Sequence, residues 1–291
     1  MVLKSFLATI ALLAVWTWVT TQLPEQLQTE QHQWISNLIL AEEYLYNSDV
    51  SNCNVLVGSS LSYRLKDDLP ENTLNLSFGG QGVFDGLNVI QKSAIKPARV
   101  LIEMNVILRP ENKSFSQYVF SPITHRFKKL LPGLQVKNQP AGVLKGFLVG
   151  RKKLANRKLD ESGKGSPKIN KNYFKLRADE YSQKPDPKLL EAAFEQLEIV
   201  VRELQQDKVS VVFFEMPIHH ELNSLTYPQS MRIRFKERFP PNQFTYIEQP
   251  DCFQFETTDG LHLNDSDIQK YASFFRDKLE SILFADSRRK R

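Results

Sequence analysis

Short β-rich runs alternate with amphipathic helical patterns along most of this chain, and this alternation constrains the fold more than any other feature. Five strands are predicted: Asn54–Val57, Thr73–Ser77, Arg99–Met104, Val209–Met216 and Phe244–Glu248. Helical patterns lie between and after them, at Val83–Ile95, Gln117–Leu130, Leu189–Gln206 and Asp265–Leu283. Strands that alternate with helices form parallel βαβ units. We therefore predict an α/β fold, a three-layer sandwich with a mainly parallel five-stranded sheet of the flavodoxin-like kind.

The first residues contain a long uncharged run, from Ser5 to Leu23, that follows a lone Lys4. Its length is close to the ~20 residues that cross a bilayer core. No small-x-small cleavage site follows, so we expect an uncleaved membrane anchor over residues 1–24 rather than a cleaved signal or a buried helix. The next basic residue is Arg64. By the positive-inside rule this predicts a single-pass protein of the inner or cytoplasmic membrane, with its body in the periplasm or cell exterior.

The rest of the chain is predicted to form one domain with a short preceding helix. Residues 25–50 carry a loose helical pattern, which predicts a membrane-proximal helix, and residues 51–286 form the domain. Within it, residues about 142–188 hold the clusters Arg151-Lys152-Lys153 and Arg157-Lys158, and we interpret this segment as a basic insertion with little regular structure. It is either a solvated loop or a strip that attracts an anionic polymer or lipid headgroups. Residues 287–291 form a basic tail.

Composition excludes several classes of protein. Lys and Arg number 38 against 33 Asp and Glu, and a net charge of +5 is too mild to favour nucleic acid as a partner. Cys53 and Cys252 belong to neither a CxxC motif nor a Cys/His cluster, so no metal site and no cofactor are predicted, while a single disulfide stays open. The pair His219-His220 follows the fourth predicted strand, either as a metal or substrate group or as ordinary loop residues.

Two short segments far apart in the sequence carry groups for nucleophilic catalysis. The first strand runs directly into Gly58-Ser59-Ser60-Leu61, which places Ser60 at the carboxyl end of a strand and near a helix N-terminus. Near the other end, Asp259-Gly260-Leu261-His262 places a carboxylate and an imidazole three residues apart on a tight turn. Such a turn can orient the imidazole so that it accepts a serine proton. Alternatively, Ser60 is a helix cap and His262 a buried structural residue.

Together these segments resemble the SGNH or GDSL-like hydrolase superfamily, whose nucleophilic serine follows the first strand and whose Asp-x-x-His lies near the C-terminus. Two further blocks are similar to that family: the segment from Asn75 to Gly82, and Glu103-Met104-Asn105. The resemblance implies a catalytic triad of Ser60, Asp259 and His262. It also implies an oxyanion hole formed by the Ser60 N–H, the Gly80 N–H and the Asn105 side-chain amide.

The chain departs from the family at two points: Ser59 stands where the family has aspartate, and the third block keeps only Asn105 of the usual Gly-x-Asn-Asp. Gly-Ser-Ser resembles the envelope acyl-transfer subgroup, the alginate O-acetylation and D-alanine-transfer proteins. That resemblance implies O-acyl transfer, expected to be acetyl, to an envelope or exported polysaccharide, with a membrane-bound O-acyltransferase as the acyl source. An esterase that uses the same triad, or a noncatalytic polymer-binding or assembly subunit, are the alternatives.

Overall fold

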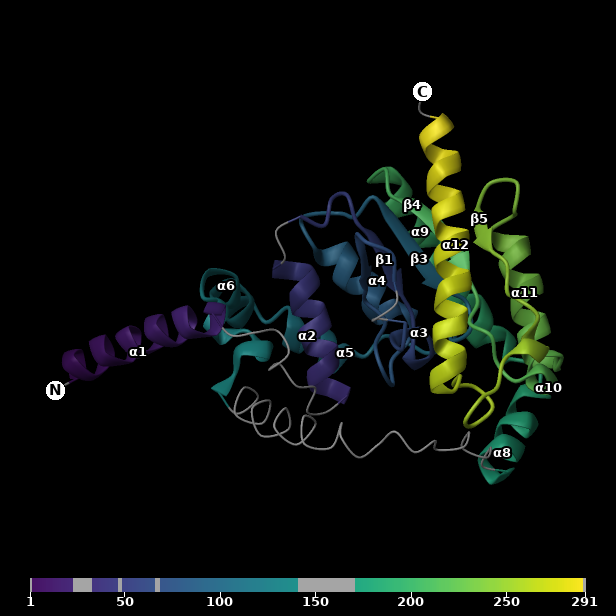
Figure 1. Ribbon diagram of the computed structural model, residues 1–291, viewed down its shortest axis with the longest axis horizontal. Helices are drawn as coiled ribbons and strands as arrows, with labels where there is room; N and C mark the ends of the chain where they lie inside the picture. Colours follow the sequence, from purple (N-terminus) through teal and green to yellow (C-terminus); the bar gives the residue numbers. More distant parts are fainter. Residues whose placement is uncertain (1, 23–32, 47–48, 66–68, 141–170, 290–291) are drawn as a thin grey trace. The chain divides into compact units, whose positions relative to one another are not determined.

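One sheet of five strands organises the larger part of the molecule (Figure 1). The structure, a computed structural model, describes residues 2–22, 33–46, 49–65, 69–140 and 171–289. The strands lie in the order β2-β1-β3-β4-β5, and all four neighbouring pairs are parallel. Their bounds are Asn54–Val57 for β1, Thr73–Asn75 for β2, Arg99–Glu103 for β3, Ser210–Phe214 for β4 and Thr245–Ile247 for β5. The predicted α/β class and five-stranded parallel sheet are confirmed.

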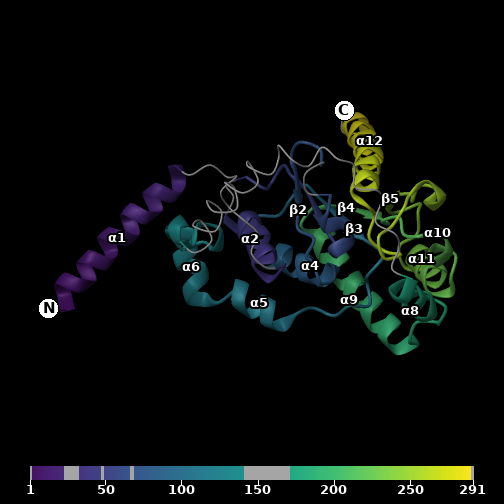
Figure 2. The ribbon, with the colours of Figure 1, turned by 60° about the horizontal axis from the view of Figure 1, so that its bottom comes forward.

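Helices cover both faces of this sheet because its central strands are apolar on both sides. Leu56, Leu101 and Val212 stand side by side on neighbouring strands, and they pack in one buried cluster with Tyr271 and Phe275 of α12, Asp265–Arg289. Helices α4, Val83–Lys92, and α9, Pro187–Gln206, cover the opposite face (Figure 2).

The strand order reverses direction between β1 and β3. The chain first moves outward from β1 to β2 and then returns to the other side of β1 to form β3. In open parallel sheets the crevice at the carboxyl ends of the strands on either side of such a reversal is where ligands bind. The loops that follow β1, β2 and β3 meet there, and these are the loops that carry the predicted serine and oxyanion residues.

Shorter helices complete this unit, which comprises Ser48–Asn112 and Ser166–Arg291. They are α3, Ser60–Tyr63; α8, Lys171–Tyr181; α10, His220–Asn223; α11, Thr226–Arg238; and the 3₁₀ turn η4, Cys252–Gln254. Helix α8 lies in the segment predicted to lack regular structure, so that prediction is wrong for its last part. Residues 142–170 of the predicted insertion, with both basic clusters, lie outside the described residues.

The second unit comprises Met1–Asn47 and Lys113–Gly165. It contains α1, Val2–Gln22; α2, Gln33–Tyr46; α5, Lys113–Val119; α6, Pro122–Leu130; and the 3₁₀ turns η2, Pro132–Leu134, and η3, Val136–Asn138. The single helix predicted over Gln117–Leu130 is divided into α5 and α6 because Pro122 lacks the N–H that would continue it. Glu42 ties this unit together: one carboxylate oxygen pairs with the buried Lys128 ammonium at 2.7 Å and the other accepts the N–H of Val136.

The prediction of a membrane anchor over residues 1–24, and of a single-pass location, is wrong. Among the residues that the structure describes, no helix is long and apolar enough to cross a bilayer. The apolar run does form helix α1, but Trp16-Thr17-Trp18 brings polar groups into its second half. The Trp16 indole N–H donates a hydrogen bond to the carbonyl of Asn138 in η3 at 2.9 Å, and Thr17 lies against Gly133 of η2, so this half packs on the protein's own turns. The prediction that the body of the protein lies in the periplasm or cell exterior depended on the anchor, so it is withdrawn together with the anchor.

Candidate active site

Ser60 lies at the carboxyl end of β1, as the first residue of the one-turn helix α3. The preceding Ser59 caps this turn, because its side-chain oxygen accepts the N–H of Leu61 at 3.2 Å. Gly58 is required where the strand enters the turn: a Cβ at this position would collide with Ser62 Oγ and with the Glu103 carboxylate. The Gly-Ser-Ser sequence therefore produces a tight strand-to-helix turn that presents Ser60 at the sheet edge.

His262 reaches this serine from the other end of the chain. Ser60 Oγ lies 2.9 Å from His262 Nε2, and His262 Nδ1 lies 2.8 Å from Asp259 Oδ2. The structure thus brings the three predicted triad residues into one hydrogen-bonded series. A proton on Nδ1, held by the carboxylate, leaves Nε2 free to accept the serine proton.

The turn that carries Asp259 and His262 is closed by the Asp259 side chain. Asp259 Oδ1 accepts the N–H of Leu261 at 3.0 Å and of His262 at 2.8 Å. Gly260 has a φ of +93°, a conformation that strongly favours glycine. Its carbonyl accepts the N–H of His219 at 2.9 Å, which fastens the turn to the loop after β4.

The hydrogen bonds around Asp259 also determine its charge. Partial burial alone would raise the pKa of this carboxyl, but the bonds from the His262 ring and from the N–H groups of His262 and Leu261 outweigh burial and hold the pKa well below its usual value. Asp259 therefore stays ionised at neutral pH beside the imidazole. A fixed negative charge there stabilises an imidazolium when it forms.

Glu103, the last residue of β3, lies beneath the serine turn and is fully buried. One carboxylate oxygen accepts the Ser59 hydroxyl at 2.8 Å, and the other accepts the Ser59 N–H at 2.9 Å, the Ser62 hydroxyl at 2.5 Å and the Ser62 N–H at 3.3 Å. Burial raises the pKa of Glu103 despite these four bonds. The carboxylate holds the residues on both sides of Ser60.

Sequence reasoning assigned no role to Glu103. Two signals were available: Ser59 stands where the resembled family has aspartate, and the charged Glu103 directly follows the apolar run Val100–Ile102 of the third predicted strand. In this structure that carboxylate comes from β3 and meets Ser59 across the turn.

The two other predicted oxyanion residues lie on neighbouring loops. Gly80 follows β2 with a φ of +71°, and its loop is tied to the serine turn because the Phe78 N–H donates to the Gly58 carbonyl at 3.1 Å. The Asn105 side chain instead forms a two-way pair with the backbone of Met216, donating to its carbonyl at 3.0 Å and accepting its N–H at 2.8 Å. An amide carries two N–H groups, so one remains for an oxyanion. Both oxyanion roles stay predictions.

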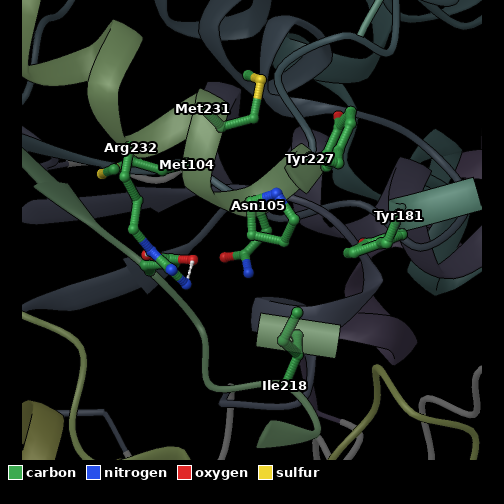
Figure 3. A pocket seen from close by; sticks show the side chains of 9 residues that line it. Met104, Asn105, Tyr181, Ile218, Tyr227, Met231 and Arg232 are labelled. Carbon is green, nitrogen blue, oxygen red and sulfur yellow. Dashed lines mark hydrogen bonds and ion pairs between the residues drawn. The ribbon is translucent and has the colours of Figure 1, made fainter. Parts of the chain in front are cut away.

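A small cavity lies beside Asn105, at the carboxyl ends of β3 and β4 (Figure 3). Tyr181, Tyr227 and Arg232 line it, and its volume of about 10 Å³ is the space of one water molecule. The Arg232 guanidinium forms a two-pronged ion pair with Glu215, with both N–O distances 2.7 Å. Residues after β3 and β4 and residues of α8 and α11 enclose this cavity, and it is too small to hold a substrate.

The two cysteines and the pair His219-His220 are the remaining residues that the sequence singled out. Cys53 and Cys252 are both free thiols. Cys53 precedes β1 and Cys252 follows β5, so they lie at opposite ends of parallel strands. Within the described part of the chain, no cluster of three or more His, Cys, Asp or Glu residues could hold a metal ion. His219 and His220 stack on each other with ring centroids 4.4 Å apart.

Comparisons with known proteins add a distant likeness to a solved structure. No protein-family model and no curated protein matches the chain. The structure is similar to a crystal structure described as that of a "putative acylhydrolase" from Bacteroides fragilis, with a TM-score of 0.43 and 11% sequence identity. The match covers 88% of this chain and 100% of the other.

Proposed function

We propose that this protein carries out serine-dependent acyl chemistry through an acyl-enzyme on Ser60. One observation carries the proposal: Ser60 Oγ, the His262 ring and the Asp259 carboxylate form a series with 2.9 Å and 2.8 Å between successive atoms. Two such contacts in the order nucleophile, base and orienting carboxylate are the geometric signature of this chemistry. The three residues come from two loops at the same sheet edge.

In the first half of the reaction, Ser60 Oγ attacks the carbonyl carbon of an ester while its proton passes to His262 Nε2. The tetrahedral intermediate then collapses, the bond to the leaving alkoxide breaks, and His262 returns the proton to that oxygen. Ser60 is left as an acyl ester. Asp259 remains ionised throughout and stabilises the imidazolium form of His262.

In the second half a hydroxyl compound takes the place of the leaving group. His262 accepts its proton as its oxygen attacks the acyl-enzyme, and Ser60 regains a proton when the new product leaves. Water gives hydrolysis, and a sugar hydroxyl gives acyl transfer. The negative oxygen of both intermediates would be held by the N–H groups of Ser60 and Gly80 with the second amide N–H of Asn105, and loss of one such donor costs on the order of a hundred- to a thousandfold in rate.

The finer proposal is transfer of the acyl group, expected to be acetyl, to a hydroxyl of a polysaccharide. It rests on the resemblance of Gly58-Ser59-Ser60 to the acyl-transfer subgroup, which also makes a membrane-bound O-acyltransferase the proposed acyl donor. Hydrolysis of acyl esters by the same three residues is the alternative.

Incubation of the protein with an activated acetyl ester, with and without neutral oligosaccharides, separates these outcomes. Acetylated sugar in the product mixture supports transfer, and release of acetate that no sugar diverts supports hydrolysis. Ser60→Ala should abolish both, whereas Ser281→Ala, a change at an exposed serine of α12, should abolish neither. If wild-type protein gives neither product and gains no acyl group on Ser60, the proposal of acyl chemistry is wrong.

A further inference from the structure

Four aromatic rings form a continuous series next to the Asp259–His262 turn, and we name it the ring stack: Phe174, His219, His220 and Phe253. Phe174 meets His219 edge to face with centroids 4.7 Å apart. His219 and His220 are stacked at 4.4 Å with an interplanar angle of 27°, and His220 and Phe253 at 4.3 Å and 25°. Three separate segments, α8, the start of α10 and η4, supply these rings.

The inner end of the ring stack touches the turn that carries the triad. His219 donates its backbone N–H to the Gly260 carbonyl at 2.9 Å. A Cβ added to Gly260 would lie 3.1 Å from a ring carbon of Phe174. Gly260 is the residue after Asp259 and precedes His262 by two positions, so the ring stack leads outward from the triad.

The outer end of the ring stack is open. Phe253 is 76% exposed although one face of its ring rests on His220, so the exposed area belongs to its other face and its edge. This exposure is built into the turn: the neighbouring Cys252 is buried, and Asp251 Oδ1 accepts the Phe253 N–H at 3.1 Å. A large aromatic ring held outward in this manner provides a flat apolar surface at the outer end of the ring stack.

The polar groups around the ring stack favour a neutral, hydroxylated ligand. His219 Nδ1 accepts the N–H of Glu221, which leaves the ring proton of the neutral imidazole on Nε2 as a donor, and burial lowers the pKa of His219 and so favours this neutral form. Glu221 follows His220 in the chain and Asp251 lies two residues before Phe253; both are exposed carboxylates and repel anions. They accept hydrogen bonds from hydroxyl groups.

We propose that the open face of Phe253 is a stacking platform for a neutral pyranose ring of the substrate. A pyranose presents an apolar C–H face to an aromatic ring and directs its hydroxyl groups to the edge, and the exposed carboxylates of Glu221 and Asp251, chain neighbours of the stacked rings, are available to accept hydrogen bonds from them. The inference rests on the proposed function in one respect: it takes the sugar to be the molecule that gives or receives the acyl group at Ser60.

Binding can be measured without turnover in the full-length Ser60→Ala protein, by calorimetric titration with cellotetraose, xylotetraose and adenosine. At least one of the tetraoses should bind, and the added change Phe253→Ala should weaken it about tenfold, the size expected for loss of one stacking contact. Phe253→Trp should restore binding. Phe284→Ala, at an exposed phenylalanine of α12, should leave it unchanged.

The proposal is overturned if neither tetraose binds, if Phe253→Ala changes the affinity less than twofold, or if adenosine alone binds in a Phe253-dependent manner. Because Ser60 is absent from the titrated protein, these outcomes are independent of catalysis. In the enzyme with Ser60 intact, Phe253→Ala should raise KM for an acetylated cellotetraose more strongly than it raises KM for vinyl acetate, which has no ring. If the wild-type protein shows no activity toward vinyl acetate, that result counts against the proposed acyl chemistry and not against the stacking platform.

Discussion

Removal of the buried Glu103 carboxylate should destabilise the protein and slow its chemistry together. In Glu103→Ala the N–H groups of Ser59 and Ser62 and the Ser59 hydroxyl lose their acceptor at a site with no solvent access. Each orphaned buried donor costs about 1–3 kcal/mol, so the three together cost about 3–9 kcal/mol. The Ser62 hydroxyl keeps a neighbour in Ser77 Oγ at 2.8 Å and adds little. This loss is a large part of the ~5–15 kcal/mol that stabilises an ordinary domain.

The rate effect follows from the place of these two N–H groups on either side of Ser60. Without the carboxylate the serine turn is free to shift, and a misplacement of about 1 Å costs on the order of a hundredfold in rate. Urea unfolding and kcat for a small acetyl ester measure the two quantities. Glu195→Ala, at an exposed position of α9, is the matched control and should change neither. Wild-type stability and wild-type kcat in a folded Glu103→Ala protein would refute the reasoning.

Glu103→Gln keeps the shape of the side chain but removes its ionisable group, so it isolates the effect of the Glu103 charge on stability. The pKa of Glu103 is raised above its ordinary value of 4.5, so the native state holds this proton more tightly than the unfolded chain. The contribution of Glu103 to stability is then fully present below pH 4.5 and is lost as the pH rises through the raised value. Urea unfolding across this window should show wild type losing stability relative to Glu103→Gln as the pH rises. A difference that is independent of pH, or that grows in the opposite direction, would contradict the assigned direction.

Two further predictions concern the turns that carry the triad. Asp259→Asn keeps the size of the side chain but favours the wrong imidazole tautomer, so kcat should fall by about 10⁴. Because the pKa of Asp259 is depressed, the carboxylate stabilises the fold above its ordinary pKa of 3.8, and this stabilisation is lost as the pH falls. Acid unfolding of Asp259→Asn should therefore show a smaller loss of stability than acid unfolding of wild type. Gly58→Ala places a methyl group against Ser62 Oγ and Glu103, and should cost about 1–3 kcal/mol in urea unfolding with a loss of kcat; an unchanged midpoint and rate would mean that the turn adapts freely.

The central strands were predictable because they are short, apolar on both faces and bounded by turn residues. β1 has the predicted bounds, Asn54–Val57, and the other four strands differ from prediction only at their ends. The proximity of Ser60 and His262 was also accessible to sequence reasoning. In a parallel sheet the loops after successive strands meet at one edge, so residues two hundred positions apart can be neighbours.

Other features were not encoded in any local pattern. Helix α11 contains Pro228 and buries only scattered residues, so its sequence has no clear helical period. Two sets of hydrogen bonds depend on how neighbouring strands align: those between Asn105 and the Met216 backbone, and those between Glu103 and the serine turn. The exposure of Phe253 likewise depends on the tertiary position of η4, since an isolated phenylalanine in a sequence gives no sign of which side faces solvent.

The most direct test of the account is covalent labelling of the folded protein with a fluorophosphonate, followed by peptide mass spectrometry. The account predicts one adduct on Ser60 in wild type, strong loss of that adduct in His262→Ala, and retention in His125→Ala, a change in the other unit of the chain. Absence of an adduct on Ser60, or equal labelling in His262→Ala, would contradict the claim that this imidazole activates this hydroxyl.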